Sequence, residues 1–289
     1  MPSSLKSQYD AQGFVVVPAL VPAGLKPDLE RASQVVIART RAGAWPHRRV
    51  VGKQFPPYGD RDPDSWGVQH LMHPDLGQPA FARYYASDEV RGAVRTLLAC
   101  AEENLQMELF NLLINPTGHA FALCWHRDDV KASATADEER EALAVWHHGI
   151  QWNTALHEDL SLFVVPGSHI HPRTPEQRAQ SCTTEAPGDP LAMPGAIRVT
   201  LHPGDTVFYN SNILHCAAYS PEAPRATLHA SMGDTRGGAA RARNVLQHGL
   251  GWMKEDRFKA TLDEVGREML GRLIRMQEGL GDVGYSLEG

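Results

Sequence analysis

The chain has 289 residues, of which 42% are hydrophobic and 21% charged, a composition that excludes a disordered chain and a fibrous repeat. Its 28 basic and 34 acidic residues give a net charge of −6, so no basic surface for nucleic acid or anionic lipid is expected. No apolar run approaches the ~20 residues that span a membrane, and no secretory signal is visible.

The first hundred residues predict helices around one long loop. Residues 13–17 form a short β-branched run that predicts a strand, and residues 25–39 carry apolar side chains at helical spacing. Residues 43–67 are rich in Pro, Gly, Asp and aromatic side chains, which predicts a loop of the kind that often serves function. Residues 79–100 again predict helix.

From residue 104 onward, short apolar or alternating runs follow one another, and turn residues separate most of them. Such a series predicts an all-β sandwich or barrel. The predicted strands cover residues 105–114, 121–125, 150–156, 160–165, 196–201, 206–209, 213–219 and 225–232. A charged, Ala-rich insertion at residues 131–148 interrupts them, and residues 254–277 predict a helix that packs on the β core. With no repeat or linker in sight, we expect a single domain over residues 1–289 with its β core at about 104–233.

The sequence contains 14 histidines, which justifies a search for metal ligands. Residues i and i+2 of a strand point to the same face, so a His-x-Asp triplet supplies two of the three ligands of a non-haem iron site. The three such triplets are His73–Asp75, His126–Asp128 and His157–Asp159. The first contains a proline within a predicted loop, and the third resembles a polar hairpin turn. The second follows an apolar strand, where it would lie at the mouth of a barrel.

A resemblance to a known family singles out the second triplet. Trp125-His126-Arg127-Asp128 resembles the W-H-x-D motif of the phytanoyl-CoA dioxygenase family of iron(II)- and 2-oxoglutarate-dependent oxygenases. That family's later landmarks follow in order as Pro166-Gly167-Ser168-His169, Gly204-Asp205, Leu214-His215 and Arg225, and the resemblance spans about residues 9–233. It disfavours the third triplet, so replacing Asp159 is expected to leave iron binding and turnover near wild type.

The resemblance implies a mainly β fold, a double-stranded β-helix (jelly-roll) with flanking helices. It implies that His126, Asp128 and His215 hold Fe(II) and that O2 is the oxidant. A guanidinium group suits the far carboxylate of the co-substrate 2-oxoglutarate, and Arg225 is the candidate. Halogenating members of the family lack the carboxylate ligand, so the presence of Asp128 disfavours halogenation.

Weaker candidates rest on approximate position. Gln106, Asn111 and Thr154 are candidate contacts of 2-oxoglutarate, although polar positions on barrel strands would account for them equally well. Ser220 is a weaker candidate of the same kind, and His169 is expected to stabilise a turn. Trp146 and His147, at the end of the insertion, are candidate substrate contacts or, with equal weight, part of a solvated loop.

The expected function is oxidation, most simply hydroxylation, of a small organic metabolite, with release of succinate and CO2. Desaturation, epoxidation or rearrangement at the same iron stays open, and so does a barrel that binds a ligand without turnover. The four cysteines contain no C-x-x-C pair, which favours free thiols in the cytoplasm. No nucleic-acid or membrane partner is expected, and the sequence leaves a homodimer open.

Overall fold

The structure is a computed structural model that describes residues 4–54, 64–146, 148–238, 241, 245–246 and 250–280. Its strands are β1 (Phe14–Val17), β2 (Arg48–Val50), β3 (Ser65–Val68), β4 (Leu105–Ile114), β5 (Phe121–Ala122), β6 (Gly149–Ala155), β7 (Leu162–Val164), β8 (Ile197–Arg198), β9 (Thr206–Tyr209), β10 (His215–Tyr219) and β11 (Ala226–Asp234). Its helices include α1 (Leu5–Gln12), α2 (Lys26–Arg41), α3 (Pro79–Tyr85), α4 (Asp88–Leu98), α5 (Ala136–Leu143), α6 (Pro175–Ser181), α8 (Asp256–Lys259) and α9 (Glu264–Glu278).

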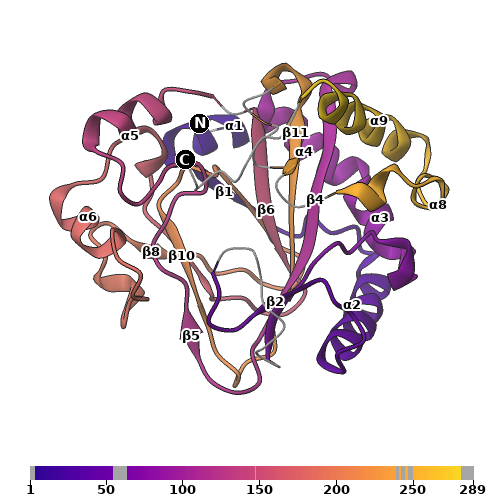
Figure 1. The fold of residues 1–289 in the computed structure, drawn as a ribbon, viewed down its shortest axis with the longest axis horizontal. Coiled ribbons are helices and arrows are strands. Elements are labelled where there is room, and N and C mark those ends of the chain that lie inside the picture. Colours follow the sequence, from indigo (N-terminus) through magenta and orange to yellow (C-terminus); the bar gives the residue numbers. More distant parts are fainter. Residues whose placement is uncertain are drawn as a thin grey trace.

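Two antiparallel sheets face each other (Figure 1). The larger sheet has the strand order β1-β9-β6-β11-β4-β3-β2, and the smaller has the order β5-β10-β7-β8. Strands β4 to β11 are divided between the two sheets, which is the arrangement of a double-stranded β-helix. The predicted mainly β, jelly-roll fold is therefore confirmed. No helix in the described ranges is long and apolar enough to cross a membrane.

Most of the helices cover one face of the larger sheet, and the other face of that sheet lines the barrel interior. Helices α2, α3, α4, α8 and α9 lie beyond the larger sheet, whereas α5 and α6 lie beside the smaller one (Figure 1). On the helix side, Phe110, Trp152 and Leu228 belong to the main hydrophobic core. Because strand side chains alternate, the residues between them face the interior, where the functional site lies.

Three sequence predictions need correction at the level of elements. The predicted loop at 43–67 contains β2 and β3, which extend the larger sheet; residues 55–63 lie outside the described residues. The predicted helix at 79–100 is two helices, because Ser87 has extended backbone angles before the acidic first turn of α4. The predicted helix at 254–277 is α8 followed by α9, since the Asp263 side chain accepts from Gly266 N and caps a new helix.

Candidate metal centre

Two of the candidate ligands are brought together by backbone pairing. His215 is the first residue of β10, and His126 follows β5, the neighbouring strand in the smaller sheet. The two residues form an antiparallel bridge in which each N–H donates to the other's carbonyl at 3.0 Å. Their imidazole centroids are consequently only 4.2 Å apart. Asp128 joins them because its N–H donates to the Ser211 carbonyl at 2.9 Å.

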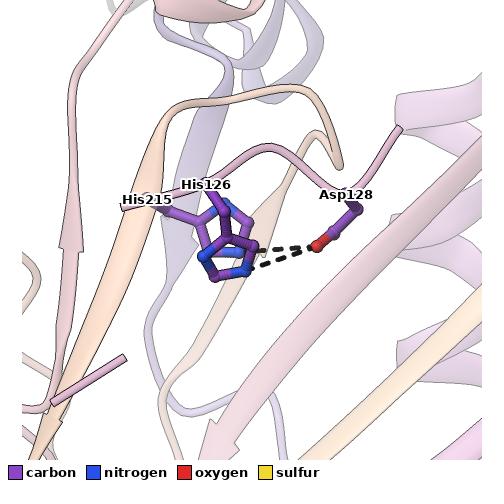
Figure 2. Close-up of side chains that lie close together, drawn as sticks. All are labelled: His126, Asp128 and His215. Atoms are coloured by element: carbon purple, nitrogen blue, oxygen red, sulfur yellow. Dashed lines mark ion pairs between the residues drawn. The ribbon is translucent and has the colours of Figure 1, made fainter. Parts of the chain in front are cut away.

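The three side chains converge on one point, as Figure 2 shows. The Oδ1 atom of Asp128 lies 3.6 Å from His126 Nε2 and 3.8 Å from His215 Nε2. One donor atom from each residue lies within 4.8 Å of the others, and no other group of three His, Cys, Asp or Glu side chains does so in the described part of the chain. Two imidazoles and one carboxylate on one side of a metal form the donor set of non-haem iron enzymes.

Hydrogen bonds orient all three donors. His126 Nδ1 donates to the Cys124 carbonyl at 2.8 Å, and His215 Nδ1 donates to the Ile213 carbonyl at 2.8 Å. A carbonyl can only accept, so each proton lies on Nδ1 and the Nε2 lone pair is left for a metal. The second oxygen of Asp128 accepts from Gln151 Nε2 at 2.6 Å, which turns Oδ1 toward the imidazoles.

Burial shifts the pKa values of all three side chains. Burial lowers the pKa of His126 to about 4, helped by the neighbouring His215, and it lowers the pKa of His215 to about 4 as well. Burial also raises the pKa of Asp128 to about 6. At neutral pH the imidazoles are therefore neutral and the carboxylate is mainly ionised, so this donor set fits a divalent metal such as Fe(II).

Arg225 lies just before β11 and is buried together with Asp159. Its Nε donates to Asp159 Oδ2 at 3.1 Å, and the Tyr219 ring lies 4.5 Å from the guanidinium carbon. Its two outer nitrogens, Nη1 and Nη2, are buried without a hydrogen-bond partner among the described residues. Buried donors without acceptors are unfavourable, and the carboxylate of a ligand would satisfy both.

The other two His-x-Asp triplets do not belong to this group of three side chains. The Nδ1 atom of His73 accepts from Asp75 N at 3.1 Å, which is the expected turn chemistry. Asp159 is more than part of a polar turn, because it is 4% exposed and also accepts from Thr227 Oγ1. Although burial opposes ionisation, Arg225 and these hydrogen bonds hold the pKa of Asp159 below its usual value. Asp159 is thus a buried partner of Arg225 and does not belong to the group formed by His126, Asp128 and His215.

The candidate co-substrate contacts divide by strand face. Thr154 faces the helices, where its hydroxyl bonds Tyr84 at 2.5 Å and Thr206 at 2.6 Å. Gln106 donates to the Met276 sulfur on α9 at 3.3 Å and has no described contact with the triad. Position alone could not assign the face of Thr154, since a shift of one residue along a strand reverses the face. Ser220 also misses the site, because it accepts from Glu222 N in an exposed turn.

Asn111 faces the interior and pairs across strands with His229. Its Oδ1 accepts from His70 N at 3.1 Å. Sequence reasoning missed the interior residues Gln151 and Asn153, the latter of which bonds His229 Nδ1 at 2.8 Å. The alternation within residues 150–156 was the available signal, because it places these two on one face and Thr154 on the other.

The end of the insertion lies beside the turn that supports Asp128. Trp146 is 38% exposed and lines a cavity of about 280 Å³ together with Tyr9 and residues 210–212. Among the described residues no contact joins Trp146 to the triad, and His147 lies outside them. His169, in the turn after β7, bonds the Asp10 carbonyl through Nε2 at 3.1 Å, as expected of a residue that stabilises a turn.

Comparisons with known proteins agree with this architecture. AviO1 from Streptomyces viridochromogenes Tue57 is 16% identical with a TM-score of 0.57, covering 80% of this chain and 94% of that one. EctD from S. alaskensis, crystallised with 2-oxoglutarate and 5-hydroxyectoine, is 16% identical with a TM-score of 0.57 and coverages of 82% and 78%. The α-ketoglutarate-dependent epimerase SnoN from nogalamycin biosynthesis is 18% identical with a TM-score of 0.53, covering 80% of each chain. At these identities the likeness shows the fold alone.

No curated protein matches the sequence. The family described as Phytanoyl-CoA dioxygenase (PhyH) matches residues 9–225, which is well over half of the chain. This range includes the histidine and aspartate triad and ends at the buried arginine. The chain therefore belongs to the phytanoyl-CoA dioxygenase (PhyH) family, whose members are Fe(II)- and 2-oxoglutarate-dependent oxygenases.

Proposed function

We propose that His126, Asp128 and His215 hold the Fe(II) of this oxygenase, and that the enzyme hydroxylates a small organic metabolite with release of succinate and CO2. The observation that carries the assignment is the convergence of three donor atoms within 4.8 Å. Bound iron would activate O2 with electrons from 2-oxoglutarate, which is chemistry that no side chain supplies. The contribution of the chain is to hold the donors in one geometry and to position the target carbon.

Arg225 is the proposed anchor for the far carboxylate of 2-oxoglutarate. Within the described residues its fork of Nη1 and Nη2 has no acceptor, while Asp159 accepts from the remaining Nε at 3.1 Å and so fixes the plane of the guanidinium. A planar fork binds a carboxylate through two parallel hydrogen bonds. Asn111 and Asn153 face the same interior and are proposed as further polar contacts of the co-substrate or the substrate.

Hydroxylation is the simplest outcome, but the fold supports others. EctD was crystallised with 5-hydroxyectoine, SnoN is described as an epimerase and SnoK as a carbocyclase. Desaturation, epoxidation or rearrangement at the same iron therefore stays an alternative outcome. A single domain over residues 1–289, a homodimer, a cytoplasmic location and substrate contacts from Trp146 and His147 also stay proposals.

The test is whether purified protein consumes 2-oxoglutarate in an iron-dependent manner. With Fe(II) and O2 we expect slow succinate formation without substrate, and a rise when a panel of metabolites includes the true substrate. Asp128→Ala should abolish both signals, whereas Glu141→Gln, an exposed change on α5, should abolish neither. Protein that binds Fe(II) and 2-oxoglutarate but forms no succinate under any condition would support the ligand-binding barrel instead.

A further inference from the structure

A buried ion cluster joins the insertion to the residue between two of the proposed iron ligands. Its centre is Glu139 on α5, whose side chain is fully buried. One carboxylate oxygen accepts from Arg127 Nε at 2.8 Å and Arg173 Nε at 2.9 Å. The other accepts from Arg178 Nη2 at 2.6 Å and from Arg173 N at 3.1 Å. We call these four residues the arginine cluster.

Arg127 connects the arginine cluster to both chain segments that contain the proposed metal ligands. It stands between His126 and Asp128, and its Nη1 donates to the carbonyls of Ser168, at 2.6 Å, and Asn212. Asn212 lies in the turn that leads to His215, and the hydroxyl of Ser168 accepts from Leu214 N at 2.8 Å. The Arg127 guanidinium group thus connects the 126–128 turn with the segment that leads to His215, the third proposed ligand.

The 126–128 turn has little regular structure to hold it. Strand β5 ends at Ala122, and beyond it the turn is tied by the bridge to His215 and the bond from Asp128 N to Ser211. The arginine cluster is a further tie, beside the bond from Gln151 to Asp128, and it depends on one negative charge. Three guanidinium groups surround a single carboxylate, so without Glu139 they would repel one another in a buried space.

We propose that Glu139 is a positioning residue for the metal centre, which it controls through Arg127. On this account the insertion is part of the scaffold that sets the spacing of His126 and Asp128 from His215. The proposal rests on the assignment of these three residues as metal ligands. It also bears on α5, because a helix anchored by a fully buried carboxylate is fixed in place.

The test uses full-length protein and Co(II), a metal whose visible spectrum reports ligand geometry, as the probe in place of Fe(II). Glu139→Gln removes the central charge, and Arg127→Lys keeps a charge but loses the fork that reaches two carbonyls. We expect each variant to bind Co(II) about 10-fold more weakly or worse, with an altered spectrum. Glu141→Gln, on the exposed face of the same helix, should match wild type in both measurements.

The melting temperature of the metal-free variants separates positioning from simple stabilisation. A lower melting temperature with unchanged Co(II) affinity and spectrum would overturn the proposal, because the cluster would then serve the fold alone. If Glu139→Gln does not fold, Arg127→Lys decides by the same criterion. Failure of wild type to bind Co(II) would instead refute the ligand assignment itself, and this is visible before any variant is made.

Discussion

Asp128 and Asp159 show how neighbours decide what a carboxylate does. Both end a His-x-Asp triplet, yet Asp128 faces two neutral imidazoles and Asp159 faces the guanidinium of Arg225. The triplet pattern could not separate these roles, because each depends on a residue far along the chain: Arg225 lies 66 residues from Asp159, and His215 is similarly distant from Asp128. The order of landmarks along the sequence selected the triplet that the structure brings together with His215, but it left the role of Asp159 unknown.

Replacing Asp159 should therefore affect the co-substrate and leave the metal alone. In Asp159→Asn, Arg225 loses its charged partner and the orientation of its fork, so we expect weaker binding of 2-oxoglutarate. Divalent-metal affinity should match wild type, since no donor atom is touched. Calorimetric titrations with metal and then 2-oxoglutarate measure both steps. Loss of metal binding in this variant would return Asp159 to the list of candidate ligands.

Arg225→Lys tests the fork directly. Lysine keeps the positive charge but cannot form two parallel bonds to a carboxylate, so the affinity for 2-oxoglutarate should fall by about 1.5–3 kcal/mol. Metal affinity is the internal control and should not change. The Michaelis constant for 2-oxoglutarate, measured through succinate release, reports the effect. A constant equal to that of wild type would assign the co-substrate carboxylate to another residue.

The shifted pKa values of the triad predict how metal binding depends on pH. Protons compete with the metal, and the first group to take one as the pH falls is Asp128, with a pKa of about 6; His126 and His215 follow at about 4. Affinity for Co(II) should be level above pH ~7, fall as the pH drops through 6 and fall more steeply near 4. A decline that begins between pH ~8 and ~7 would show that a group with a higher pKa binds the metal.

At the scale of elements, β6 is a strand whose position the sequence predicted but whose inward face it did not. Its alternation of apolar and polar residues predicted a strand over 150–156, and the strand is Gly149–Ala155. The alternation separates Gln151 and Asn153 from Thr154, but it does not tell which of the two faces turns inward, because both faces of this strand are covered and polar residues occur on each. Thr154 is satisfied within the helix-facing core, whereas Gln151 reaches the metal centre.

The two faces of β6 can be compared by a matched pair of variants. Thr154→Val removes the hydroxyl that bonds Tyr84 and Thr206, so the free energy of unfolding in urea should fall by about 1–3 kcal/mol. Its affinities for metal and 2-oxoglutarate should stay at wild-type values. Gln151→Ala should show the opposite pattern, with weaker metal binding because Asp128 loses the bond that orients it. Weaker 2-oxoglutarate binding by Thr154→Val would contradict the assignment of faces.

Local signals account for the errors in the helical regions as well. The predicted helix at 79–100 had helical periodicity throughout, but Ser87 before Asp88 and Glu89 is a helix-start signal that divides it. Helix α6 begins with a capping box of Thr174 and Gln177, a signal that was present and not used. Capping residues thus mark boundaries where apolar periodicity alone does not.

At the scale of the whole molecule, the sequence predicted the architecture and the triad, but not how they are connected. The jelly-roll follows from the strand series, whereas the metal centre requires β5 and β10 to pair, which brings His126 beside His215. The residues that support the site come from distant segments, such as Gln54 beside Cys124 and Asn212 beside Arg127. Such contacts depend on tertiary structure, and no spacing rule predicts them.

The central claim is that one metal ion binds to His126, Asp128 and His215. Anaerobic titration with Fe(II), read by calorimetry, tests it most directly in wild type, Asp128→Ala and His215→Ala. His73→Gln is the matched control, because it alters a buried histidine of a competing triplet. We predict one Fe(II) per chain in wild type and in the control, and none in the two triad variants. Stoichiometric Fe(II) binding that survives Asp128→Ala and His215→Ala would contradict the account.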